Sequence, residues 1–95
     1  MKEYEISSTK AYRKDYKRLS KSGRDVRNLE DVIDRLASGE ILEHRYQDHP
    51  LRGMFSGARE CHIGPDWLLM YVKDEGTLVL LLLRTGTHRN VLGME

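Results

Sequence analysis

The sequence predicts one small α+β domain with the order β-α-α-β-β-β, in which an antiparallel sheet has a two-helix hairpin on one face. Three observations predict it: an apolar run typical of a buried strand, two stretches with helical periodicity, and turn residues between the last three strands. A chain of 95 residues is long enough for one core and too short for two. Residues 1–95 are therefore expected to form a single domain.

The segment Leu78–Leu83 is wholly apolar. It is too short to cross a bilayer and is typical of a strand buried on both faces, which places it at the centre of the sheet. It ends at a polar cluster, Arg84-Thr85-Gly86-Thr87-His88. Packing alone does not require an arginine, two hydroxyls and an imidazole at the exit of a core strand. This end of the domain is therefore predicted to be the functional one.

The elements before the central strand are a short strand and two helices. The alternation of Tyr4-Glu5-Ile6 predicts a strand at an edge or paired with the central run. A hydroxyl residue among Ser7, Ser8 and Thr9 is expected to cap the first helix, which ends at Ser22-Gly23. The second helix is predicted from about Asp25 to Ala37 and closes at Gly39. Apolar stripes mark the buried faces of the two helices: Tyr12, Tyr16 and Leu19 in the first, and Val26, Leu29, Val32, Ile33 and Leu36 in the second.

Residues 40–55 lack periodicity and predict a long loop, which contains His44 and His49. Strands are then expected at Ala58–Ile63 and Trp67–Val72. Turns at 64–66 and 74–76 join them to each other and to the central strand. The last residues, 89–95, are enough for a turn or a short edge strand. The second face of the sheet is therefore expected to have no helix over it and to be open to an extended ligand.

Charge is divided unevenly along the chain. Residues 10–27 have eight basic and two acidic side chains, a net charge of +6, whereas residues 28–48 have a net charge of −4. This asymmetry favours a polyanion-binding face on the first helix, although a basic, solvated helix face is the alternative. The candidate phosphate-binding residues are Lys10, Arg13, Lys14, Lys17, Arg18 and Lys21.

Hairpin geometry gathers polar side chains at one end of the sheet. The central strand runs antiparallel to the strand before it, so the end of one lies beside the start of the other. The residues brought together are His62, Asp66, Trp67, Arg84 and His88, and His49 in the loop can reach the same edge. Imidazoles can act as acid and base at neutral pH, an arginine can stabilise a charged phosphate transition state, and an exposed tryptophan can stack a base. The set suits cleavage of a phosphodiester bond in RNA.

Four motifs together resemble, in order and spacing, the signature of YafQ-type toxins of the RelE/ParE superfamily. They are Asp48-His49-Pro50-Leu51, Gly57 with Arg59, His62-Ile63-Gly64-Pro65-Asp66-Trp67, and Arg84-Thr85-Gly86-Thr87-His88. The resemblance covers essentially the whole chain. It implies the RelE-like, microbial RNase-like fold and a ribosome-dependent endoribonuclease that cuts mRNA codons in the A site without metal or other cofactor. It also implies a cognate antitoxin of the DinJ or RelB type as a partner, with the ribosome and mRNA.

By this resemblance the active-site positions of the family fall on His49, His62, Asp66, Trp67, Arg84 and His88. A further position, usually phenylalanine, falls on Leu92, which removes a stacking surface for the base. Arg84 is expected to stabilise transition-state charge and His88 to act as general acid. The base and orienting roles are left open among His49, His62 and Asp66. The expected product ends are a 2′,3′-cyclic phosphate and a 5′-hydroxyl.

Several alternatives remain open. His49 can simply order its loop, His62 can be a structural histidine, Asp66 a turn former and Trp67 a core residue. A zinc site formed by His62 and Asp66 with His49 or His88 is a further interpretation. At the level of function, the alternative is a ParE-like binding toxin that acts on a protein such as gyrase, but such toxins lack this set of histidines.

Two expectations concern the cellular setting. The lone Cys61 is expected to lie in the core without chemical function, since one cysteine cannot form an internal disulfide. The charged N-terminal segment does not look like an export signal, and no membrane partner is expected. Together they predict a reducing, cytoplasmic location.

Overall fold

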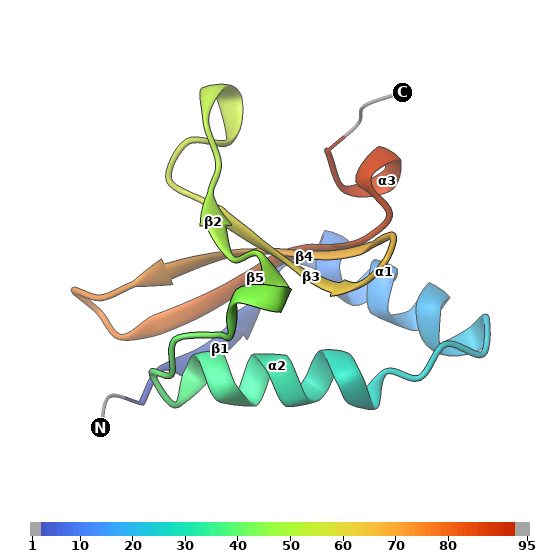
Figure 1. Cartoon of the computed structure of the whole chain (residues 1–95), viewed down its shortest axis with the longest axis horizontal. Coiled ribbons are helices and arrows are strands. Elements are labelled where there is room, and N and C mark those ends of the chain that lie inside the picture. The colour runs from blue at the N-terminus through green and yellow to red at the C-terminus, as the bar shows by residue number, and fades with distance from the viewer. Residues whose placement is uncertain (1–2, 93–95) are drawn as a thin grey trace.

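The computed structural model describes residues 3–92, apart from the side chain of Leu92, and has the predicted α+β class. The described residues form a five-stranded sheet in the order β1-β5-β4-β3-β2, with β5 and β4 at its centre (Figure 1). The strands are β1 (Glu5–Ser8), β2 (His49–Pro50), β3 (Arg59–Gly64), β4 (Trp67–Asp74) and β5 (Val79–Gly86). The helices are α1 (Lys10–Lys21), α2 (Arg27–Ala37) and α3 (His88–Leu92), and two 3-10 turns are η1 (His44–Tyr46) and η2 (Gly53–Phe55).

The sheet is mixed, which corrects the prediction of a wholly antiparallel sheet. Strands β2 to β5 pair antiparallel, but β1 pairs parallel with β5 from Glu5 opposite Val79 to Ser8 opposite Leu82. The reason is topological. β1 and β5 are not joined by a tight turn, because α1, α2 and the β3–β4 hairpin lie between them in the chain, so β5 can run in the same direction as β1. The sequence left open whether β1 lies at an edge or pairs with the central run, and the structure shows that it does both.

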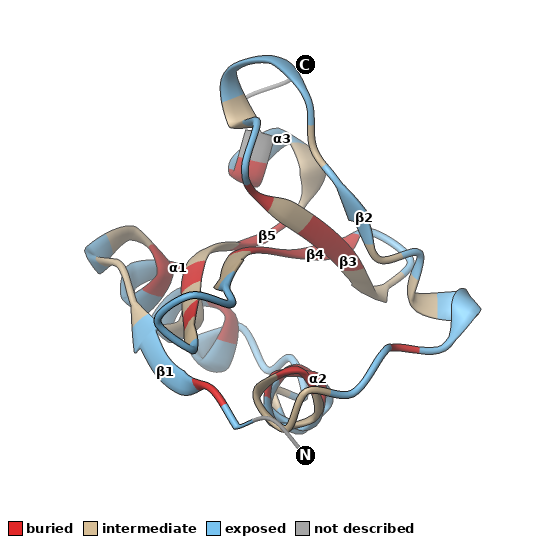
Figure 2. Cartoon of the chain, turned by 90° about the vertical axis from the view of Figure 1, so that its left-hand side faces the viewer, coloured by how far each residue is buried: buried red, intermediate tan, exposed pale blue. Residues whose placement is uncertain are grey.

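Helices α1 and α2 cover one face of the sheet, which we call the helix face (Figure 1). The main core lies between them and alternate residues of the strands, and Figure 2 shows the buried positions concentrated in the central strands and on the inner side of α2. Its fully buried members are Leu29 and Leu36 of α2, Cys61 of β3, Leu69 and Tyr71 of β4, and Leu80 of β5. Burial raises the pKa of the Cys61 thiol to about 12, which fits the expectation of an inert core cysteine.

Thr9 fixes the start of α1 against the central strand. Its Oγ1 accepts a hydrogen bond from the Tyr12 backbone N–H at 3.0 Å and donates one to the Leu83 carbonyl at 2.7 Å. The Thr9 N–H also donates to the Leu82 carbonyl at 3.0 Å. The predicted cap residue therefore also joins the helix to β5, immediately before the polar end of that strand.

The other face of the sheet, which we call the α3 face, is not bare as predicted. Helix α3 and the loop around η2 project over it (Figure 1), and Val91 packs with Met70 and Ala58 in a second, smaller apolar cluster. The sequence did not reveal α3 because it has five residues and starts at His88. The α3 face is therefore partly covered by chain segments that also contribute polar groups.

The central strand begins one residue later than the apolar run. Leu78 is exposed with a φ of 56° and belongs to the turn, and β5 starts at Val79. Leu80 and Leu82 are buried against the helices, but Leu81 on the α3 face is only half-buried. Burial is thus complete on one face only, because α3 is too short to cover the whole strand.

Among the described residues, no helix has the length and apolar character needed to cross a membrane.

Candidate active site

Three histidines and two acidic residues meet on the α3 face, and we call them the titratable cluster. Its members are His49 of β2, Glu60 and His62 of β3, Asp66 of the β3–β4 turn, and His88 at the start of α3. The rings of His62 and His88 lie edge to face with centroids 5.9 Å apart. His88 Nδ1 is 3.8 Å from Asp66 Oδ1, within ion-pair range. The structure therefore brings together four of the residues that the sequence predicted to meet.

Glu60 is the member of the cluster that the sequence interpretation missed. It is only 5% exposed, its Oε1 lies 3.1 Å from His49 Nε2, and its Oε2 is buried with no hydrogen-bond partner among the described residues. A buried carboxylate oxygen without a partner is costly, so its presence calls for a reason such as a catalytic role or a bound ion. The signal was present in the strand alternation, since Glu60 stands two residues before His62 and so shares its face.

His49 is held through both nitrogens of its ring. Nδ1 lies 2.6 Å from the Gln47 carbonyl oxygen, and Nε2 faces Glu60. Both neighbours are acceptors, so either ring nitrogen can donate a hydrogen bond, and the two contacts fix the plane of the ring. Gln47 has a φ of 49°, in the left-handed region that non-glycine residues seldom adopt. The loop thus uses an unusual backbone conformation where it presents a carbonyl to His49.

Asp48 anchors the loop that delivers His49. Its carboxylate accepts hydrogen bonds from the Tyr71 hydroxyl and from Arg59 Nε, the latter at 3.3 Å. Burial and the bond to Asp48 raise the pKa of Tyr71, so the phenol stays protonated as a donor. β2 then pairs antiparallel with β3, with His49 directly opposite Glu60. The loop of residues 40–55 is therefore ordered, as predicted, and fixed to the sheet on both sides of His49.

Arg84 lies on the α3 face in the same row across the strands as Glu60. Arg84 pairs with Met70 and Met70 with Glu60, and residues directly opposite in an antiparallel sheet share a face. The guanidinium turns toward the edge of β5 and donates from Nε to Asp15 Oδ2 at 2.6 Å and from Nη2 to Asp15 Oδ1 at 3.1 Å. These bonds raise the pKa of Arg84, which is a cation at every relevant pH.

Trp67 is a core residue, which corrects the prediction of an exposed stacking surface. The side chain is 5% exposed and packs in the main core on the helix face. Its Nε1 donates to Thr85 Oγ1 at 2.9 Å, and the Arg24 guanidinium lies 5.5 Å from the ring centroid. The first residue of β4 alternates onto the helix face, where the ends of α1 and β5 enclose the indole.

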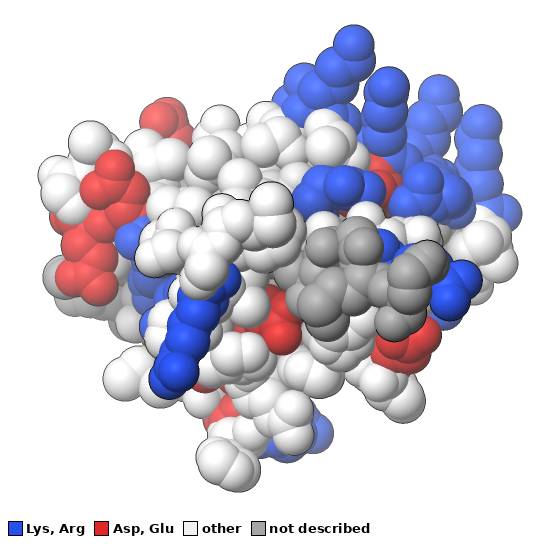
Figure 3. Space-filling view, turned by 90° about the horizontal axis from the view of Figure 1, so that it is seen from above, with Lys and Arg blue, Asp and Glu red and all other residues white. Residues whose placement is uncertain are grey.

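The basic residues predicted on the first helix form an exposed patch along α1, and Lys and Arg side chains gather over that part of the molecule (Figure 3). Lys10, Lys14, Lys17 and Lys21 are exposed to solvent. Arg13 is exposed as well and donates to the Ser8 carbonyl at 2.8 Å. The side chain of Leu92, at the end of α3, lies outside the described part of the chain.

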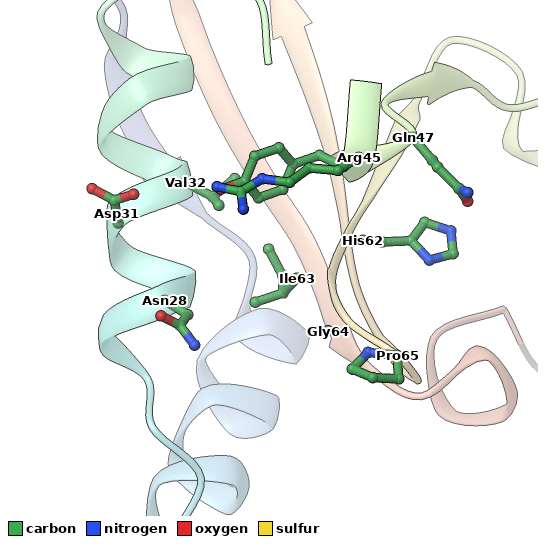
Figure 4. A pocket seen from close by; sticks show the side chains of 10 residues that line it. Asn28, Asp31, Val32, Arg45, Gln47, His62, Ile63, Gly64 and Pro65 are labelled. Carbon is green, nitrogen blue, oxygen red and sulfur yellow. The ribbon is translucent and has the colours of Figure 1, made fainter. Parts of the chain in front are cut away.

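A groove of about 620 Å³ runs between α2 and β3 and passes His62. Its walls include Asn28 and Asp31 of α2 and Arg45 of η1, and Figure 4 shows Ile63 directed toward α2 while the His62 ring points away from it. The groove is lined by none of the other members of the titratable cluster. It therefore reaches the cluster only at His62.

Glu60, His62 and His88 could also hold a metal ion. One ligand atom from each lies within 4.8 Å of the others, among the described residues. Imidazole nitrogens with a carboxylate oxygen are a donor set for zinc, copper or nickel. The zinc alternative drawn from the sequence named Asp66 as a ligand with His62, but the set that converges here contains Glu60 in its place.

Comparison with known proteins connects this site to a family. Residues 4–93 match the family model described as "Bacterial toxin of type II toxin-antitoxin system, YafQ". The mRNA interferase toxin YafQ of Escherichia coli K12 is 34% identical over 90 residues, which cover 94% of this chain and 96% of the relative.

Solved structures give the same result. The toxin in the E. coli DinJ-YafQ toxin-antitoxin complex superimposes with a TM-score of 0.86 at 34% identity, covering 96% of this chain and 99% of that one. A metal-bound toxin from Helicobacter pylori also has a TM-score of 0.86, at 39% identity, with coverage of 93% and 98%. The chain therefore belongs to the YafQ family of toxins of bacterial type II toxin–antitoxin systems.

Proposed function

We propose that this toxin is an mRNA interferase that cleaves ribosome-bound mRNA by acid–base catalysis at the titratable cluster. The observation that supports this most is the meeting of His49, His62 and His88 with two carboxylates on the face that also presents Arg84. RNA supplies its own nucleophile, the 2′-hydroxyl, so the protein must only move protons and stabilise charge. The products are a 2′,3′-cyclic phosphate and a 5′-hydroxyl.

The roles follow from the partners of each group. His88 is the general acid, because Asp66 faces Nδ1 and the other ring nitrogen can carry a proton to the leaving oxygen. His49 and His62 share the work of the base, and Glu60 orients His49 through Nε2. Arg84 stabilises the additional negative charge on the phosphorus centre. Trp67 supports Thr85 from the core in place of the stacking role expected from the sequence.

The partners are a ribosome, its mRNA and a cognate antitoxin of the DinJ or RelB type. The exposed basic side chains of α1 bind ribosomal RNA phosphates, so binding weakens as salt rises. The E. coli relative is found in complex with DinJ, which supports the antitoxin class proposed here. Action on ribosomes places the toxin in the cytoplasm.

Expression in a bacterial host tests the function. The wild-type toxin should arrest growth and produce new mRNA 5′ ends in phase with codons, and Arg84→Ala or His88→Ala should do neither. Equal toxicity of all three would rule out this site. Intact mRNA together with altered DNA supercoiling would instead support a ParE-like toxin that binds gyrase.

Metal binding by Glu60, His62 and His88 is a second function that the geometry favours. A metal-bound toxin from Helicobacter pylori is among the similar structures, and a copper-bound mutant toxin from the same organism is another. A bound ion would occupy the imidazole lone pairs that proton transfer needs, so it should inhibit cleavage. We expect Zn²⁺ or Cu²⁺ to bind the wild type in calorimetry and to bind His88→Ala more weakly. Loss of cleavage on adding a chelator would show instead that the reaction requires metal.

A further inference from the structure

Asp15 of α1 is a buried carboxylate outside the titratable cluster, and three of the hydrogen bonds that it accepts come from the end of β5. It is 1% exposed and lies within the apolar stripe of α1, at the spacing of Tyr12 and Leu19. A carboxylate at a core position is unfavourable unless cations and N–H groups surround it. The arrangement of those donors indicates what the residue does.

The sheet leaves a place for Asp15 at the edge of β5. β1 pairs with β5 only as far as Leu82, and the chain then turns away into α1. Beyond that point the Thr85 N–H lacks a strand neighbour on this side, and it donates to Asp15 Oδ2 at 3.1 Å. The Asp15 carboxylate thus takes the position that a β1 carbonyl would have held if the strand had continued.

The same carboxylate holds the guanidinium of Arg84. Nε and Nη2 donate to its two oxygens at 2.6 Å and 3.1 Å, in the bidentate geometry that fixes the guanidinium plane. Nη1 takes no part in these bonds, and we assign it to a phosphate oxygen of the substrate. Arg18 also donates to Asp15 Oδ1 at 2.9 Å. With two arginines on one carboxylate, the group keeps a net charge of +1, so Asp15 orients Arg84 without cancelling the positive charge.

We infer that Asp15 is a positioning residue for RNA cleavage: it holds Arg84 in the orientation that presents Nη1 to the scissile phosphate. This inference rests on the proposed nuclease function. It assigns α1 a second role beyond binding RNA, since the helix also supplies the group that locks the arginine. Asp15 does not touch the substrate and acts only through Arg84.

A double-mutant cycle on ribosome-bound mRNA tests the inference. Asp15→Asn keeps the shape but presents an amide where two arginines and an N–H need oxygens. We expect its single-turnover cleavage rate to fall about 30-fold, since misplacing a catalytic group by about 1 Å can cost roughly a hundredfold. The toxin concentration that gives half the maximal rate should change little, because Asp15 does not touch the substrate. In an Arg84→Ala background the same substitution should cost less than about threefold, because the residue through which it acts is gone. Asp34→Asn on α2 removes one exposed carboxylate and serves as the matched control, with wild-type rate.

Two outcomes overturn the inference. One is an Asp15→Asn enzyme with wild-type rate, and the other is an equal loss with and without Arg84, which indicates a general structural defect. Thermal unfolding of each variant identifies such a defect directly. If Asp15→Asn does not fold, Asp15→Glu keeps the charge, displaces the guanidinium by one methylene and should show the same non-additive loss.

A measurement that needs no activity separates failure of this inference from failure of the proposed function. In the wild type, the Arg84 Nε–H should give a nitrogen–proton NMR signal protected from exchange with water, and the Asp15 substitution should remove the protection. A toxin that cleaves no RNA but shows this protection contradicts the nuclease assignment alone. An unprotected Arg84 signal in an active wild-type toxin contradicts the role of Asp15 alone.

Discussion

The two faces of the sheet are built from alternate residues of the same strands, yet they differ in chemistry. In β3, Cys61 is buried under the helices, whereas its neighbours Glu60 and His62 point to the α3 face. The helix face has two long helices over it and an apolar core, and the α3 face has a short helix and a small apolar cluster. The comparison indicates that the helix face supplies stability and leaves the α3 face free to hold polar groups that stability alone would not favour.

The largest stability effect should come from the centre of the helix face. Leu80→Ala removes a fully buried side chain from the central strand and should lower the free energy of unfolding by about 2–5 kcal/mol, because a cavity remains. Urea denaturation measures it. Cleavage per folded molecule should stay near wild type at low temperature. If Leu80→Ala is instead as stable as wild type but inactive, the helix face would serve activity rather than stability, which contradicts the assignment.

Trp67→Phe should have an intermediate effect. The phenyl ring fills less space and cannot donate to Thr85 Oγ1, so we expect a loss of about 1–3 kcal/mol in unfolding free energy. The cleavage rate at saturating ribosomes should change less than about threefold, because the indole is buried. If the rate instead falls strongly at unchanged stability, Trp67 acts on the RNA after all.

Glu60→Met should affect stability and activity differently, with the unfolding free energy kept or raised and the cleavage rate lowered. It replaces a carboxylate that has one buried oxygen without a partner by an apolar side chain of similar size. The unfolding free energy should be unchanged or rise by about 1 kcal/mol. The cleavage rate should fall at least about tenfold, since His49 loses the group facing Nε2. Simultaneous loss of stability would indicate that Glu60 is a structural residue.

The smallest effect should be the response to alkaline pH. Burial raises the pKa of Tyr71 above that of an unfolded tyrosine, near 10. The protonated phenol is therefore favoured in the folded state, and the stability it contributes is present below about pH 10 and declines as pH rises above that value. Tyr71→Phe should show a shallower loss of stability than wild type between about pH 10 and 11. If the unfolding free energies of the two proteins fall equally as pH rises, the ionisation of Tyr71 is not linked to stability.

Local patterns predicted much of this molecule. A hydroxyl cap among residues 7–9, most positions of the two helical stripes and the two hairpins depend on residues close in sequence, and the structure confirms them. The meeting of His62, Asp66 and His88 also follows from hairpin register.

The features that sequence reasoning missed depend on distant contacts. The parallel pairing of β1 and the burial of Trp67 are decided by segments far along the chain. Asp15 stood in the apolar stripe of α1, but its partner Arg84 is 69 residues away. An acidic residue at a core position of a helix is nevertheless a signal that can be read from sequence, because it requires a cation from elsewhere in the fold.

The central claim is that the α3 face performs the cleavage and that its polar groups are not needed for folding. Cleavage of mRNA on purified ribosomes by wild type and His88→Gln, with the unfolding temperature of each, tests it most directly. We predict that wild type leaves 2′,3′-cyclic phosphate ends in the presence of a chelator. His88→Gln should unfold within a few degrees of wild type and cleave about 10²–10⁴ times more slowly. Equal cleavage by the two proteins, or a loss of activity that accompanies unfolding, would contradict the account.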